Sequence, residues 1–93
     1  DTDLHVISGD RWFASGKLKE ELSSGGTKVI MKMGKNLSAI LKLVVELGIE
    51  EKCFLVQNAS LCNERIIYGK DFNQFALESD DEKSYFSVLI CKL

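Results

Sequence analysis

The segment 37–45 constrains the fold more than any other part of this 93-residue chain, because its apolar residues recur with the period of an α-helix. The apolar positions fall at i, i+3, i+4, i+7 and i+8 and are Leu37, Ile40, Leu41, Val44 and Val45. Asn36 is able to cap the start of such a helix, and Gly48 is a typical stop. A single apolar stripe needs a partner surface, so we expect this helix to pack on a sheet.

Five segments have the length and composition of β-strands. Residues 27–33 (TKVIMKM) start with β-branched side chains and form an apolar run that is too short for a typical helix. We expect this run to be a buried strand close to the middle of the sheet. The other four strands are predicted at 4–8, 53–56, 65–68 and 85–90.

Two shorter helical segments lie between these strands. Ser15 is a candidate cap for a helix over 17–22, which the glycine pair at 25–26 would end. Asp71 is placed to cap a short helical turn further along the chain. The apolar side of that turn carries Phe72, Phe75 and Ala76.

The order of these elements predicts the α/β class. Strand, helix, strand, helix, strand, strand, helix and strand follow one another, which indicates a mixed sheet of about five strands flanked by helices. Parallel crossovers are expected early in the chain and antiparallel pairing later.

Length and composition favour a single globular domain over residues 1–93. Apolar residues make up 45% and charged residues 28% of the chain, which is the balance of a protein that folds around one core. A second core would leave each half too small to be stable. The net charge of −2 gives no basic excess to neutralise phosphates, so nucleic acid is not an expected partner.

The sequence has no mark of a membrane span or a secretory signal. No apolar stretch approaches the roughly 20 residues that cross a bilayer, and the N-terminus, DTDLHVISGD, lacks the basic and apolar regions of a signal peptide. We therefore expect a soluble protein without a membrane partner. The chain does not begin with methionine, so we expect it to belong to a longer polypeptide or to have been trimmed.

The cysteines point to a reducing compartment. Cys53, Cys62 and Cys91 are odd in number, and their spacing fits neither a disulfide framework nor a zinc site. A cytoplasmic location is the expectation that follows. Cys53 and Cys91 lie in predicted strands and should be buried, whereas Cys62 lies in a predicted loop, where a structural and a reactive role both remain open.

The residues alone predict no complete catalytic apparatus. Gly9 and Gly16 are too far apart for a phosphate-binding loop. His5, the one histidine, lies in a predicted strand without a Ser or Cys at motif spacing, so a structural role is expected. The acidic group at 78–82 lacks the glycine and the terminal glutamate of a calcium loop, and we interpret it as a solvated loop.

Lys32 is the most unusual residue of the apolar run 27–33. A lysine in such a run must either reach the edge of the sheet with its ammonium group or meet an anion. Met31 and Met33 stand on either side of it, and either methionine could be part of the core.

Three segments carry a resemblance to a known family. They are VIMKMGKNLSAIL at 29–41, FLVQNASLCNERII at 54–67 and SYFSVLI at 84–90. In this order and spacing, and together with the opening DLHVISG, they resemble the C-terminal half of the tetrapyrrole (corrin/porphyrin) methyltransferases. The likeness is greatest to the precorrin-2 C20-methyltransferase branch of cobalamin biosynthesis. It covers nearly the whole chain, and order and spacing carry it more than any one motif.

The resemblance implies a cofactor site. In that family a two-domain enzyme binds S-adenosylmethionine between its halves and methylates a reduced tetrapyrrole. By resemblance, Met33 would lie against the adenine, Gly34 would permit close approach at the turn, and Tyr85 would close the slot. Small residues would offer backbone groups to the cofactor, and these are Asn58, Ala59 and Ser60. A flat apolar slot with a few main-chain hydrogen bonds suits an adenine.

Three positions leave a choice open within that resemblance. Many relatives have proline shortly after the small-residue turn, where this chain has Cys62, so the loop is expected to be less rigid here. Phe86 would either help to close the slot or belong to the core. Arg65 would reach a substrate carboxylate, the other domain or neither.

The family's N-terminal half, with its glycine-rich cofactor loop and most of the tetrapyrrole trough, has no counterpart in these residues. The expected partners are therefore a tetrapyrrole substrate, the missing N-terminal domain and a second copy in a homodimer. Methyl transfer needs the sulfonium and the nucleophilic carbon held in line, so the 93 residues alone are expected to be inactive. The alternative is a non-enzymatic α/β module that binds a nucleotide or a partner protein through an apolar edge.

Overall fold

The computed structural model describes residues 4–57, 64–78 and 87–93. Its strands are β1 (Leu4–Ser8), β2 (Thr27–Met31), β3 (Cys53–Gln57), β4 (Arg65–Tyr68) and β5 (Val88–Lys92). Its α-helices are α1 (Gly9–Ser15), α2 (Lys17–Leu22), α3 (Leu37–Glu46) and α4 (Phe72–Glu78). Short 3₁₀ turns precede α3, β3 and α4, and these are η1 (Gly34–Asn36), η2 (Glu50–Lys52) and η3 (Gly69–Asp71).

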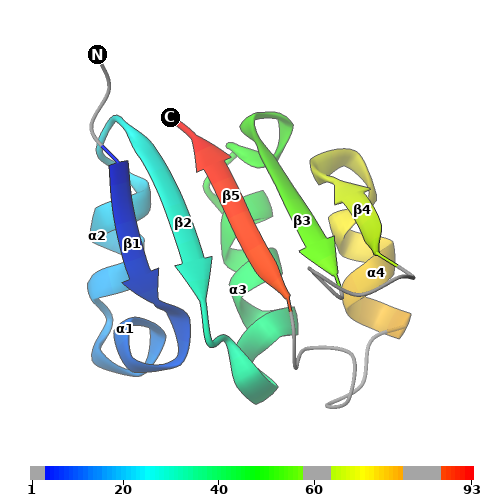
Figure 1. The fold of residues 1–93 in the computed structure, drawn as a ribbon, viewed down its shortest axis with the longest axis horizontal. Coiled ribbons are helices and arrows are strands. Elements are labelled where there is room, and N and C mark those ends of the chain that lie inside the picture. The colour runs from blue at the N-terminus through cyan, green and yellow to red at the C-terminus, as the bar shows by residue number, and fades with distance from the viewer. Residues whose placement is uncertain (1–3, 58–63, 79–86) are drawn as a thin grey trace.

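The five strands form one mixed sheet in the order β1-β2-β5-β3-β4 (Figure 1). β1 and β2 are parallel, β5 is antiparallel to both β2 and β3, and β3 is antiparallel to β4. The predicted α/β class is confirmed, as are the early parallel and the late antiparallel pairings. β5 occupies the middle position and β2 lies directly beside it, so the prediction of a strand close to the middle of the sheet is confirmed.

The helices all cover one face of the sheet (Figure 1). Alternate strand residues are buried on that face, for example Ile30 in β2, Leu55 in β3 and Leu89 in β5. The stripe predicted on 37–45 supplies the helix side of this core with Leu37, Ile40, Leu41 and Val44. The core therefore lies between the sheet and one layer of helices.

Helix α1 was not expected, since Ser8 to Asp10 have turn chemistry. The Asp10 carboxylate accepts hydrogen bonds from the Ser8 hydroxyl at 3.0 Å and from the Arg11 N–H at 2.7 Å, which favours a helical first turn. Gly16 ends α1 with φ = 80° and a bond from its N–H to the Phe13 carbonyl. Ser15, predicted to cap the helix that follows, is therefore the last residue of α1, and Gly16 is the N-cap of α2. The Ser15 hydroxyl still accepts a 3.4 Å hydrogen bond from the Lys17 N–H at the start of α2.

The last strand is shifted relative to the prediction. It was expected over 85–90 and is found as β5 over 88–92, with Lys92 paired to Thr27 and Cys91 paired to Lys28. Pairing with β2 holds the strand as far as Lys92. Tyr85 and Phe86 lie outside the described residues.

Gly69 fixes the position of the outer strand β4. The chain enters η3 directly against η2, and a Cβ placed on Gly69 would lie 1.6 Å from the Glu50 carbonyl oxygen. Two backbones are in contact here, so no side-chain movement relieves the clash. Only glycine fits this position without displacing β4 or η2.

Replacing Gly69 with alanine should destabilise the fold by about 3 kcal/mol, at the upper end of overpacking effects, because the backbone itself has to move. Urea unfolding followed by circular dichroism measures this change. Gly25→Ala is the matched control, since a Cβ at Gly25 meets nothing within 4 Å. Equal stability of the two variants would show that η2 and η3 do not pack as described.

Candidate functional site

The strands that run in the same direction, β1, β2 and β3, all end on one side of the sheet (Figure 1). Ligands of open α/β sheets bind in this region, outside the carboxyl ends of parallel strands. We call this side the carboxyl end of the sheet and the opposite side the amino end. Among the described residues, the candidate site is therefore built from the turns after β1 and β2, the end of β3 and the start of β5.

The turn after β2 has an unusual backbone. Lys32 and Gly34 both have positive φ, 53° and 55°, while Met33 between them is right-handed with φ = −75°. Alternation of left- and right-handed residues turns successive N–H groups towards one side, which is the geometry of backbone anion sites. Gly34 is exposed, and a Cβ placed on it would meet nothing within 4 Å. Space for a ligand is thus open beside Gly34.

Met33 does not face that space. The residue is 0% exposed and belongs to the core cluster. Its carbonyl accepts a 3.0 Å hydrogen bond from the Asn36 N–H, which closes the turn into η1. In this conformation Met33 anchors the turn from the core side. Lys32 was predicted to lie within the strand 27–33, but β2 ends at Met31, so Lys32 lies in the turn and is exposed.

Gly9 packs the turn after β1 against the turn after β2. A Cβ on Gly9 would lie 2.7 Å from the Met33 Cγ and 2.9 Å from the Ile30 Cγ2. The Asp10 N–H donates a 3.0 Å hydrogen bond to the Lys32 carbonyl. The sequence showed Gly9 only as a turn residue, because the close approach depends on the parallel pairing of β1 and β2.

Two buried polar residues, Gln57 and Ser87, lie at the same end of the sheet. Gln57 is the last residue of β3, and Ser87 directly precedes β5. The antiparallel register pairs Val56 with Val88, so one further step places Gln57 beside Ser87. Neither residue was singled out from the sequence, although a glutamine that closes an apolar strand was an available signal.

The structure describes two of the six residues predicted to contact a cofactor. Met33 and Gly34 are adjacent at the carboxyl end of the sheet, as described above. The other four, Asn58, Ala59, Ser60 and Tyr85, lie outside the described residues, as do Cys62 and Phe86. Gln57, which directly precedes Asn58 in the sequence, is the last residue of β3 and lies at this end.

Arg65 lies beside a shallow hollow of about 200 Å³ on the helix side of β4. Asp71, Gln74 and Phe75 from η3 and α4 line the hollow with it. Arg65 pairs with Gln57 in the ladder between β3 and β4, which places this hollow next to the carboxyl end of the sheet.

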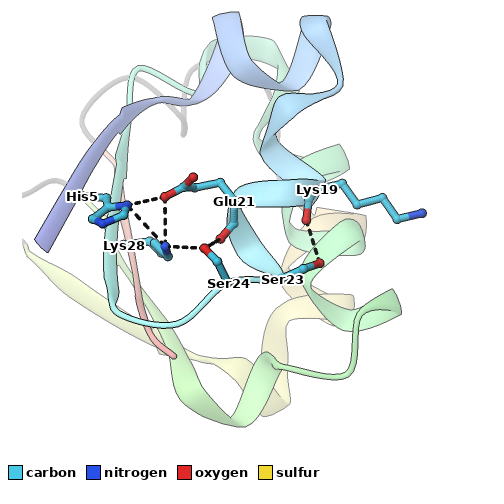
Figure 2. A network of polar contacts seen from close by, with 6 residues as sticks. All are labelled: His5, Lys19, Glu21, Ser23, Ser24 and Lys28. Atoms are coloured by element: carbon cyan, nitrogen blue, oxygen red, sulfur yellow. Dashed lines mark hydrogen bonds and ion pairs between the residues drawn. The ribbon is translucent and has the colours of Figure 1, made fainter. Parts of the chain in front are cut away.

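A second polar cluster lies on the helix side near the amino end of β1 and β2 (Figure 2). The Lys28 ammonium, 0% exposed, donates 2.9 Å hydrogen bonds to the Glu21 carboxylate and to the Ser24 hydroxyl. It also lies 3.4 Å from the His5 Nδ1, and the same imidazole nitrogen contacts Glu21. The sequence prediction considered Lys32 and overlooked Lys28, whose burial follows from its place opposite α2.

This cluster joins β1, β2 and α2, and it provides hydrogen-bond partners for the buried Lys28 ammonium. Hydrogen bonds from Lys28, which has the larger effect, and from His5 hold the pKa of Glu21 below its usual value. The ammonium is already paired, and the cluster lies away from the carboxyl end of the sheet. The structural role predicted for His5 agrees with this arrangement.

The ion pair of Glu21 with Lys28 should make stability depend on pH. A lowered folded-state pKa contributes stability above the unfolded-state pKa, and this contribution is lost as the pH falls through the folded-state pKa. Glu21→Gln should cost about 1–3 kcal/mol in urea unfolding at pH 7, because the buried Lys28 loses its anionic partner. The difference from the unmodified chain should shrink at pH 3.

Glu20→Gln, on the exposed neighbour in the same helix, is the control and should change stability little at either pH. A cost for Glu21→Gln that stays the same from pH 7 to pH 3 would contradict the ion pair.

The two described cysteines are buried, as predicted, and neither is placed to act as a nucleophile. Cys53 and Cys91 are paired across β3 and β5. A hydrogen bond with Cys53 and burial both raise the pKa of the Cys91 thiol. Within the described ranges no group of three or more histidine, cysteine or acidic residues is arranged to hold a metal ion.

No helix among the described residues is long and apolar enough to cross a bilayer.

The sequence matches no protein-family model and no curated protein closely enough to assign a family. Solved structures do match the fold. One is the cobalamin biosynthetic enzyme cobalt precorrin-4 methyltransferase CbiF, with a TM-score of 0.61 and 13% identity. Two others are of uroporphyrin-III C-methyltransferase from Thermus thermophilus, the native form (TM-score 0.57, 17% identity) and a complex with S-adenosylhomocysteine (TM-score 0.58, 18% identity).

Each likeness covers 97% of this chain and 40–41% of the solved structure. The chain thus spans about two fifths of the length of these enzymes. Identities below one fifth show a shared fold, and the α/β fold predicted from the resemblance to tetrapyrrole methyltransferases is confirmed. What the enzymes bind and methylate is a property of those proteins.

Proposed function

We propose that this chain is the cofactor-contacting domain of a methyltransferase that uses S-adenosylmethionine to methylate a tetrapyrrole. The observation that carries the proposal is the likeness of nearly the whole chain to three structures of tetrapyrrole methyltransferases. One of these holds S-adenosylhomocysteine, the compound left when S-adenosylmethionine gives up its methyl group. The sequence resemblance had led to the same class of enzyme independently.

The finer assignment rests on the sequence. The segments at 29–41, 54–67 and 84–90 are most similar to the precorrin-2 C20-methyltransferases, which favours precorrin-2 as the substrate and C20 as the methylated carbon in cobalamin biosynthesis. The partner domain would be the N-terminal half of that family, since the chain spans only 40–41% of the solved enzymes. A cytoplasmic location remains part of this proposal.

The carboxyl end of the sheet fits such a cofactor in part. Gly34 offers an exposed backbone with open space where a Cβ would stand, so a flat ring could approach the main chain there. The Met33 side chain is in the core, so we assign it to holding the turn and not to the wall of the slot. Asn58, Ala59, Ser60 and Tyr85 would complete the pocket in this proposal.

The work of this domain is binding and orientation. S-adenosylmethionine, when bound, supplies an electrophilic methyl group. The chain's own contribution would be to fix the adenosine end through the Gly34 turn, whose position Gly9 and the hydrogen bond from Asp10 to Lys32 determine. In-line transfer needs the acceptor carbon on the other side of the methyl group. The partner domain would position that acceptor, so the chain alone would not transfer methyl groups.

Blocking the space at Gly34 should weaken cofactor binding without damaging the fold. Gly34→Asn adds a side chain, and asparagine tolerates a left-handed backbone better than other residues. Titration calorimetry with S-adenosylhomocysteine should show an affinity at least about tenfold lower than that of the unmodified chain, a loss of about 1.4 kcal/mol.

Gly48→Asn is the matched control, because Gly48 also has positive φ and an open Cβ position but lies at the far end of α3. Its affinity should equal that of the unmodified chain. Absence of any binding to the unmodified chain would favour the non-enzymatic module instead, and equal losses in both variants would place the site elsewhere.

A further inference from the structure

Cys53 and Cys91 face each other across two central strands of the sheet. Cys53 is the first residue of β3, Cys91 lies near the end of β5, and the antiparallel register makes them direct partners. Directly opposed residues point to the same face of a sheet. Here this is the core face, because Cys53 is 3% and Cys91 0% exposed. Spacing along the sequence did not suggest a pair, since the contact depends on the insertion of β5 beside β3.

This placement satisfies the geometry that a disulfide requires. Directly opposed residues of antiparallel strands have Cα atoms about 4.5 or 5.5 Å apart, depending on the hydrogen-bonding pattern. Disulfides join residues whose Cα atoms are about 4.4–6.8 Å apart, so either spacing is suitable. The side chains are already close, since the two thiols are in hydrogen-bond contact. A bond between the two Sγ atoms therefore needs no rearrangement of the strands.

Hydrogen bonds keep both thiols protonated in the closed structure. The Cys53 thiol donates a 3.3 Å hydrogen bond to the Ile49 carbonyl. Because its single proton is used there, Cys91 is the donor in the contact between the two thiols. This contact and burial raise the pKa of the Cys91 thiol. Reaction with an oxidant therefore belongs to a locally opened state, in which a thiolate forms.

We propose that Cys53 and Cys91 form a reversible disulfide with an oxidised low-molecular-weight disulfide, such as glutathione disulfide, as the oxidant. In the opened state the Cys53 thiolate attacks one glutathione sulfur and breaks its S–S bond, and one glutathione leaves with the Cys53 proton. The Cys91 thiolate then attacks the Cys53 sulfur and displaces the second glutathione, which takes the Cys91 proton. Two protein thiols are oxidised, and glutathione disulfide is reduced to two thiols.

Cys53 is the thiol that reacts first, because it borders open space. It lines a shallow hollow of about 250 Å³ together with Glu51, Tyr68, Gly69 and Lys70. A small opening at the start of β3 therefore brings its sulfur to solvent. Cys91 lies behind it in the core and has Cys53 as its neighbour across the strands.

The bond joins β3 covalently to β5, the strand that connects β2 with β3 in the sheet. A cross-link between residues far apart in the sequence removes conformations from the unfolded chain, so the fold becomes more stable. By linkage, the fold favours the disulfide by the same factor. Both cysteines lie towards the amino end of the sheet, so the disulfide does not depend on the proposed methyltransferase function.

Equilibration of the 93-residue chain in buffers of reduced and oxidised glutathione tests the proposal. The reaction is started both from the reduced chain and from a chain oxidised in urea, so that slow access to buried thiols does not limit the result. Peptide mapping after acid quenching should find Cys53 linked to Cys91. The equilibrium constant for this bond should be at least about tenfold higher in the folded chain than in urea.

Two variants serve as controls, and circular dichroism shows whether each folds. Cys62→Ser removes the third cysteine and should leave the equilibrium constant unchanged. The double variant Ile90→Cys with Cys91→Ala moves the second thiol to the opposite face of the sheet at nearly the same separation in sequence. Its bond to Cys53 should be no more favourable in the folded chain than in urea.

An equilibrium constant in the folded chain that is equal to or below the value in urea overturns the proposal. So does a double variant whose bond to Cys53 is favoured as much by folding as the bond between Cys53 and Cys91. An oxidised chain that fails to refold when the urea is removed also overturns it, because the folded sheet would then not accept the bond.

Discussion

The insertion of β5 between β2 and β3 is the interaction on which the rest of the structure depends. β1, α1, α2 and β2 form one half of the molecule, and β3, β4 and α4 form the other. In the sheet the two halves are joined through β5, whose residues Val88 to Lys92 pair with both neighbours. Of the strand pairings in the sheet, that of β2 with β5 joins the residues that are farthest apart in the sequence. It also places the last strand at the centre of the sheet.

The same insertion shapes the candidate site. Because β5 is antiparallel to its neighbours, it starts where β2 and β3 end, and Ser87 comes to lie beside Gln57. The turns after β1 and β2 are fixed to each other on the other side, by the glycine contact of Gly9 with Met33. The carboxyl end of the sheet is therefore a rigid support that leaves Gly34 exposed. Among the described residues, a single layer of helices covers one face of this sheet (Figure 1).

Local patterns were sufficient to predict most elements, and contacts distant in sequence explain the rest. The stripe from Leu37 to Val44 and the glycine at 48 predicted α3 well, because helix periodicity and stop signals are local properties. The helix α1 was missed because Asp10 stabilises its first turn with a carboxylate that also suits a turn. Nothing in the sequence distinguished Lys28 from the other lysines, because His5, Glu21 and Ser24 surround it only in the folded structure.

Two of the predicted site residues lie in the described part of the chain, and their role toward a cofactor stays a prediction. The resemblance placed Met33 and Gly34 together, and the structure puts both at the end of β2 where ligands of such sheets bind. It did not reveal that Met33 is turned inwards while Gly34 is exposed, since that depends on the positive φ of Lys32 and on packing against Gly9. Burial at a turn is decided by tertiary contacts that spacing does not encode.

The central claim is that the carboxyl end of this sheet receives the adenosine part of S-adenosylmethionine. Amide chemical-shift mapping with S-adenosylhomocysteine tests it most directly, because the method locates even weak binding residue by residue. We expect the largest changes at Asp10, Lys32 and Gly34, with Ser24 and Gly25 at the amino end unaffected. Changes confined to the amino end, or none at saturating ligand, would contradict this account.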